Sequence, residues 1–85
     1  MNNDTPGRRL IAAIQARITR GRIAWLEWEL RTVEHDILVT TEEITDCEID
    51  GLHSTADALL SHLHMRVTQA AGLRDRIHQL KESLQ

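Results

Sequence analysis

The side chains best suited to chemistry in this chain are imidazoles and one thiol, which together could bind a metal ion. Two ligands on one helix share a face when they are three or four residues apart, and no two histidines have that spacing. Antiparallel helices would bring His35 near His64, with Asp36 alongside, so a site between two helices remains an alternative. Because imidazoles outside a core need no ligand role, we expect neither metal nor cofactor. The candidate ligands are His35, His53, His62, His64, His78 and Cys47.

The sequence shows no pattern typical of an enzyme. Cys47 follows Ile44 by three residues and extends the same apolar stripe, which favours a small buried side chain. Its neighbours Asp46 and Glu48 are acidic, whereas reactive thiolates lie in electropositive surroundings. A glycine-rich phosphate loop, a nucleophile elbow and a metalloprotease helix are all missing from the sequence. We therefore expect a non-enzymatic protein.

Composition limits the chain to one small helical domain with an aliphatic core. Its 85 residues are 41% hydrophobic and 27% charged, which is not the composition of a disordered segment. Trp25 and Trp28 are its two aromatic residues. One cysteine cannot form an internal disulfide, so we expect a cytoplasmic location. No apolar stretch approaches the ~20 residues of a membrane span, and we expect no membrane partner.

The element that must position these residues is a seven-residue apolar repeat in two segments separated by Asp50-Gly51. Alternating steps of three and four residues keep one stripe of a helix facing a partner helix. The pattern predicts an all-α antiparallel helical hairpin, with or without a short separate basic N-terminal helix, that assembles into a helical bundle. The first stripe is Ile23, Leu26, Leu30, Val33, Ile37, Thr40 and Ile44; the second is Ala56, Leu59, Leu63, Ala70, Leu73, Ile77, Leu80 and Leu84, interrupted by Arg66.

Local signals set the expected limits of the helices. Thr5 is suited to cap the first helix, and Ser54 with Asp57 resembles a capping box that starts the second. Gly21 weakens the first helix, which is either one long bent helix or two helices at 6–20 and 22–47. The predicted segments are a polar tail at 1–5 and one hairpin domain at 6–85, with a helix at 6–47, a turn at 48–53 and a helix at 54–84.

The expected turn also predicts which residues face each other. Antiparallel geometry pairs position i with about position 101 − i, which places Trp28 opposite Leu73 and Trp25 near Arg76. We expect one tryptophan to be buried inside the hairpin and the other to lie at an interface. Residues 5–16 have no partner within the chain although they carry apolar side chains. This overhang predicts self-association or docking.

Charge is segregated along the chain. Residues 1–22 carry five arginines and one acid, for a net charge of +4, and residues 23–50 carry nine acids and one arginine, for a net charge of −8. Residues 51–85 carry four basic and three acidic residues, for a net charge of +1. The basic end could bind the acidic segment of a second copy or a nucleic acid, and the acidic segment could instead mimic a nucleic acid.

These patterns predict a small non-enzymatic adaptor, inhibitor or regulator that acts by protein–protein contact and forms a homodimer or a larger bundle. The alternative is a nucleic-acid-binding regulator that uses the arginine-rich N-terminal helix, and a further alternative is an acidic mimic that blocks a nucleic-acid-handling protein. The predicted partner surface is Arg8, Arg9, Leu10, Ile14, Arg17, Arg20, Arg22, Trp25 and Trp28. The alternative acidic face is Glu27, Glu34, Glu42, Glu43, Asp46 and Asp50.

Overall fold

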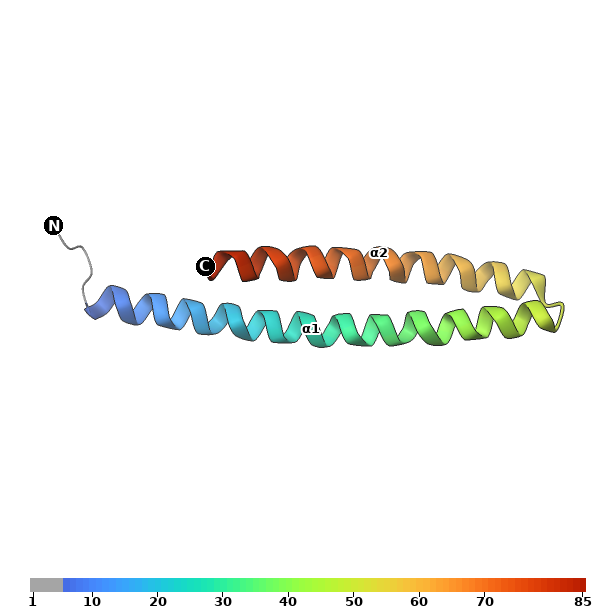
Figure 1. Ribbon diagram of the computed structural model, residues 1–85, viewed down its shortest axis with the longest axis horizontal. Helices are drawn as coiled ribbons and strands as arrows, with labels where there is room; N and C mark the ends of the chain where they lie inside the picture. Colours follow the sequence, from blue (N-terminus) through green and yellow to red (C-terminus); the bar gives the residue numbers. More distant parts are fainter. Residues whose placement is uncertain (1–5) are drawn as a thin grey trace.

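The computed structural model describes residues 6–85, which form two antiparallel helices joined by a tight turn (Figure 1). Helix α1 spans Pro6–Ile49 and helix α2 spans His53–Ser83. The hairpin is 73 Å long and 16 by 14 Å across. The predicted all-α hairpin is confirmed, whereas the tail at 1–5 and the cap at Thr5 lie outside the described residues.

Helix α1 is continuous through Gly21, so the alternative with a separate N-terminal helix is wrong for this structure. An interior glycine costs about 1 kcal/mol relative to alanine, which is small in a helix of 44 residues that packs on α2 from Ile23 onward. The helix also continues two residues past the predicted end at residue 47, as far as Ile49.

The turn ends α1 with a Schellman motif. Gly51 has φ of 74°, a left-handed conformation that glycine adopts without a steric penalty. The N–H of Leu52 donates to the carbonyl of Cys47 at 2.8 Å, and the N–H of Gly51 donates to the carbonyl of Glu48 at 3.2 Å. These bonds satisfy carbonyls at the end of the helix, and they confirm the predicted role of Gly51.

Helix α2 begins without the predicted capping box. Its N-cap residue is Leu52, no side chain caps it, and Ser54 lies inside the first turn. The carbonyl of Leu52 already accepts the first helical hydrogen bond, from the N–H of Ala56 at 3.0 Å. Because Leu52 closes the Schellman motif and also starts α2, the linker has no residue left over for a separate polar cap.

The core is a single seam between the two helices. Both predicted stripes face each other: their side chains are buried or half-buried, apart from Leu84 at the chain end, and Arg66 is half-buried within the second. The most buried side chain is Ala70, at 1% exposure, where the helices approach closely. The fully buried positions are Ile23, Leu26, Val33, Thr40, Ile44, Ala56, Ala70 and Ile77.

The predicted pairing of Trp28 with Leu73 is wrong, because Trp28 is 52% exposed while Leu73 lies in the seam. Leu73 packs with Leu30 against the cluster of Ile23, Leu26 and Ile77, and not against Trp28. Trp28 lies two positions from the stripe residue Leu26, or about 200° around the helix, so it cannot enter the seam. The packing of whole stripes against each other, which turn residues alone do not fix, decides the register.

Thr40 is the one polar residue among the fully buried positions of residues 6–85, with a side chain that is 3% exposed. Burying a hydroxyl in an apolar seam is less favourable than burying a methyl group of the same shape. We therefore expect Thr40→Val to raise the free energy of unfolding by about 1 kcal/mol, measured by urea denaturation. Thr41→Val is the control, since Thr41 is exposed and its hydroxyl donates to the carbonyl of Ile37. An equal gain for both variants would contradict this explanation.

Candidate functional site

The titratable groups that the fold brings together form an ion-pair cluster across the seam. The Nε of Arg66 donates to Oδ2 of Asp36 at 2.7 Å, and Nε2 of His62 lies 2.9 Å from the same oxygen. The Nη1 of Arg66 also donates to Oε1 of Gln69 at 2.8 Å. The interruption of the second apolar stripe by Arg66 is thus explained by a carboxylate on α1.

His35 and His64, which could have formed a site with Asp36, take no part in this cluster. Asp36 pairs with His62, while His35 and His64 are both exposed. Among residues 6–85, no group of three or more histidine, cysteine, aspartate or glutamate side chains is placed to hold a metal ion. The sequence predicts a buried Cys47, and the structure leaves it half-buried at the turn end of the seam.

The pKa of Asp36 is lowered from its ordinary value of 3.8, first by the hydrogen bond with His62. Partial desolvation acts in the opposite direction, and the hydrogen bond from Arg66 lowers the pKa further. A carboxyl with a lowered folded-state pKa stabilises the fold above its ordinary pKa, and this contribution is lost as the pH falls through the folded-state value. We expect the hairpin to lose stability below about pH 4, where unfolded aspartate becomes protonated.

Thermal melting followed by circular dichroism at pH 7, 4, 3 and 2 tests this expectation. Asp36→Asn should lower the melting temperature at pH 7, and the difference from the natural chain should shrink as the pH falls below 4. The same difference at every pH would show that the carboxylate charge contributes nothing.

Other cross-helix ion pairs use part of the predicted acidic face. Glu34 accepts from Nη2 of Arg74 at 3.1 Å, and Glu27 lies 4.0 Å from Nζ of Lys81. The other four members, Glu42, Glu43, Asp46 and Asp50, are exposed toward the turn. Two of the six carboxylates are therefore paired across the hairpin, and four are exposed near the turn.

The largest unpartnered feature is a second apolar stripe on α1. This stripe, called the outer stripe below, has six positions. They are Ile11, Ile14, Ile18, Gly21, Trp25 and Trp28. Its large side chains are 49% to 59% exposed. Their steps alternate between three and four residues, and the outer stripe is offset by two positions from the seam residues Ile23 and Leu26. Two positions turn the helix by about 200°, so the outer stripe lies mainly on the side of α1 away from α2. Ile18 and Trp25 also border hollows that α2 residues line, at Leu84 and at Arg76.

The two tryptophans lie side by side on the outer stripe. The ring centroids of Trp25 and Trp28 are 5.3 Å apart and their planes make an angle of 29°. Both rings are exposed, so the prediction that one is buried inside the hairpin is wrong. Trp25 does lie near Arg76, as predicted, since both line a shallow hollow beside the seam. The stack presents a wide apolar surface to solvent.

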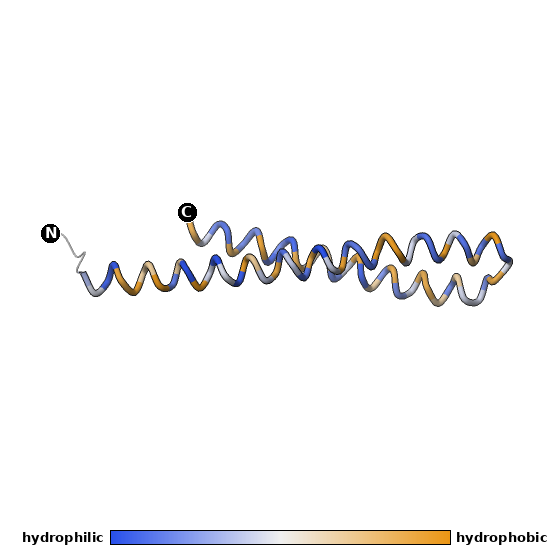
Figure 2. The backbone as a smooth tube through the Cα atoms, turned by 90° about the horizontal axis from the view of Figure 1, so that it is seen from below, coloured by the Kyte–Doolittle hydropathy of each residue, from blue (hydrophilic) through white to orange (hydrophobic). Residues whose placement is uncertain are grey.

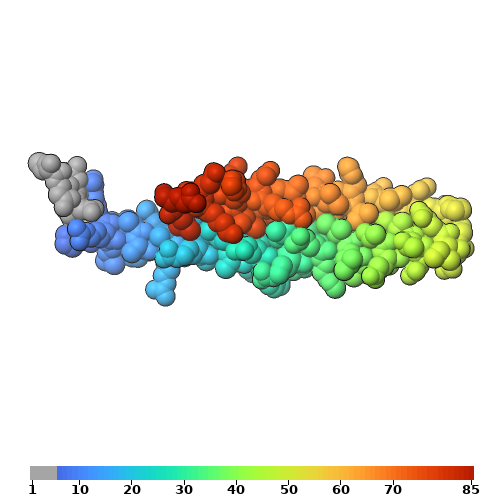
Figure 3. Space-filling view, in the orientation of Figure 1, coloured from blue at the N-terminus to red at the C-terminus, as the bar shows by residue number. Residues whose placement is uncertain are grey.

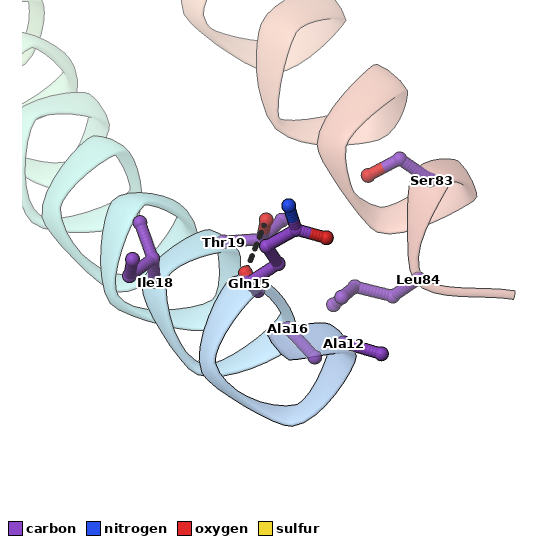
Figure 4. A pocket seen from close by; sticks show the side chains of 7 residues that line it. All are labelled: Ala12, Gln15, Ala16, Ile18, Thr19, Ser83 and Leu84. Atoms are coloured by element: carbon purple, nitrogen blue, oxygen red, sulfur yellow. Dashed lines mark hydrogen bonds between the residues drawn. The ribbon is translucent and has the colours of Figure 1, made fainter. Parts of the chain in front are cut away.

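The overhang is the part of α1 that extends past the end of α2. Its large apolar side chains lie on the outer stripe, and small residues lie on the side that continues the seam. Helix α2 ends beside α1, and the N-terminal part of α1 extends beyond it (Figures 1 and 3). Ala12 and Ala16 lie on the side of α1 near Leu84, and Ile18 lies farther from Leu84 (Figure 4). A hydropathy colouring shows apolar residues recurring along this unpaired part of α1 (Figure 2). The open hollow at the end of α2 is lined by Ala12, Gln15, Ala16, Ile18, Thr19, Ser83 and Leu84.

Arg17 and Arg22 border the outer stripe, and the arginines of α1 do not gather on one face. Arg17 precedes Ile18 and Arg22 follows Gly21, which places them at opposite edges of the stripe. Of the predicted partner surface, all nine residues are exposed. Sequence reasoning missed Ile11, Ile18 and Gly21, although the heptad spacing that joins them to the tryptophans was present in the sequence.

No protein-family model matches this chain, and no curated protein or solved structure matches it either. Within residues 6–85, neither helix has a stretch that is long and apolar enough to cross a membrane.

Proposed function

We propose that this protein is a non-enzymatic adaptor, inhibitor or regulator that docks a partner helix on the outer stripe. The observation that carries the proposal is a heptad row of five large apolar side chains, about half exposed, on the face of α1 turned away from α2. A narrow apolar stripe with this period is the surface that one helix presents to another. An exposed apolar patch on a small protein is a common mark of an interaction site.

The composition of the outer stripe also favours a protein partner over a nucleic acid. Tryptophan and arginine are enriched among the residues that dominate binding energy at protein interfaces, and an apolar centre with a charged rim is typical of such interfaces. Here Trp25 and Trp28 lie in the centre, while Arg17 and Arg22 lie at the edges. A nucleic-acid backbone would instead favour arginines gathered along one groove.

Site-specific photocrosslinking in the native host tests the proposal. A photoreactive phenylalanine derivative replaces Ile18 on the outer stripe or, as the control, Leu38, which is equally apolar and 59% exposed. Leu38 lies on α1 beyond the outer stripe. We expect a covalent adduct with a polypeptide from position 18 and none from position 38. An adduct with nucleic acid alone, or no adduct from position 18, would contradict the proposal.

A further inference from the structure

We infer that the partner helix is α1 of a second copy, packed antiparallel against the outer stripe. This inference rests on the proposed docking function and names the occupant of the same surface. In this dimer, position i of one copy faces about position 39 − i of the other. The two outer stripes then overlap along their full length, from residue 11 to residue 28.

The side-chain sizes favour the antiparallel pairing. It places Ile11 opposite Trp28, Ile14 opposite Trp25, and Ile18 opposite Gly21 of the second copy. Each layer then combines a larger side chain with a smaller one, which is how facing layers fill space at the density of a protein interior. A parallel pairing would put each tryptophan against its own counterpart and leave an empty layer at Gly21, so oversized and empty layers would lie side by side.

Gly21, like Gly72 on α2, has open space where a side chain would lie, and on the outer stripe the antiparallel dimer fills that space. A Cβ atom built at this position would meet no atom of the chain within 4 Å. The hairpin therefore does not need a glycine here, although its presence costs about 1 kcal/mol of helix stability relative to alanine. A second copy supplies a reason, because Ile18 of that copy fills the space above Gly21.

Charge agrees with the antiparallel arrangement. Residues 6–16 carry two arginines and no acid, and they lie beside residues 23–33 of the second copy, where two glutamates outnumber one arginine. Residues at the same edge of the stripe face each other in an antiparallel pair, so Arg17 lies beside Ala24 and Arg22 beside Gln15 of the second copy. A parallel pairing would instead bring opposite edges together and set Arg17 beside Arg22 of the second copy, where like charges repel.

Both hairpins remain intact in this dimer. Helix α2 packs on the opposite side of α1, and its last helical residue, Ser83, lies close to Thr19. Position 19 is next to the centre of the antiparallel overlap. The overhang of each copy thus covers the outer stripe of the other, and the end of α2 borders the new interface near Ile18.

Disulfide trapping tests both the partner and the register. In full-length chains carrying Cys47→Ser, one variant has Ile14→Cys and another has Trp25→Cys. We expect a disulfide-linked dimer when the two variants are mixed and oxidised, and none when either is oxidised alone. In the antiparallel register two copies of residue 14 lie about 16 Å apart, as do two copies of residue 25, beyond the roughly 7 Å limit for a disulfide. Equal trapping of a single variant by itself would show a parallel dimer and overturn the inference.

Sedimentation equilibrium of the natural chain, Ile18→Glu and Leu38→Glu supplies the second measurement. We expect the natural chain and Leu38→Glu to sediment as dimers, and Ile18→Glu to dissociate at least about 100-fold more readily. Circular dichroism checks that both variants stay helical, as expected for exposed positions. A natural chain that is monomeric at 200 µM overturns the second-copy inference, and a position-18 adduct with another polypeptide would then still support the docking function.

Discussion

Replacing Gly21 with leucine will make a single hairpin more stable and its dimer weaker. Leucine favours the helix over glycine by about 0.8 kcal/mol, and the side chain meets no atom of its own chain near Cβ. In the antiparallel dimer the same side chain overfills the two layers in which Gly21 faces Ile18. Overpacking costs about 1–3 kcal/mol per site, so the dimer of Gly21→Leu should dissociate at least about 30-fold more readily.

Gly72→Leu is the matched control for this experiment. Gly72 is also an exposed glycine inside a helix, where an added Cβ atom would meet no atom of the chain within 4 Å, but it lies on α2, away from the outer stripe. Both variants should gain stability in urea at protein concentrations where the chain is monomeric. Sedimentation should then show weaker dimers for Gly21→Leu alone. Unchanged association of Gly21→Leu would exclude the Ile18–Gly21 layer.

Replacing Ile77 with alanine will open a cavity in the core cluster and leave a hairpin close to unfolding. Ile77 is 7% exposed and packs with Ile23 and Leu26 of α1. Truncation of a buried isoleucine to alanine costs about 2–5 kcal/mol through lost burial and a residual cavity. A domain of this size is stable by only about 4–13 kcal/mol, so this loss is a large share of the total.

Val67→Ala is the corresponding control on the exposed side of α2. Val67 is 48% exposed, and its truncation should change the free energy of unfolding by less than about 0.5 kcal/mol. Urea denaturation followed by circular dichroism at one fixed protein concentration compares the two variants with the natural chain. Similar shifts for both would mean that the Ile23–Leu26–Ile77 cluster is not the main source of stability.

The outer stripe and the seam share a short part of α1. Between residues 23 and 28, the helix has seam residues toward α2 and tryptophans on the opposite face. Changes in the seam act on folding, whereas changes in the outer stripe act on association, because the two faces share no side chain. The variants of Ile77 and Gly21 therefore separate the two properties experimentally.

Periodic spacing determined the hairpin by itself. The stripe from Ile23 to Ile44, its counterpart on α2 and the left-handed Gly51 follow from local rules, since the helix period and the freedom of glycine depend on the nearby sequence alone. The predicted partner surface also included Trp25 and Trp28, although only one of them was expected outside the hairpin. The predicted surface joined the overhang to the tryptophans, but it followed the arginines and left out Ile11, Ile18 and Gly21, so the apolar stripe itself was not predicted.

Tertiary structure decided which residues meet across the seam. Asp36 pairs with His62 and Arg66, and Leu73 packs against the Ile23–Leu26–Ile77 cluster. These contacts depend on the register of two antiparallel helices, which is the sum of many contacts between residues distant in sequence. A shift of one residue turns a side chain by about 100° around its helix, so a small error in register exchanges its neighbours. Both tryptophans lie on the outside for the same reason. Only one face of α1 packs against α2, and the opposite face is left to solvent or to a partner.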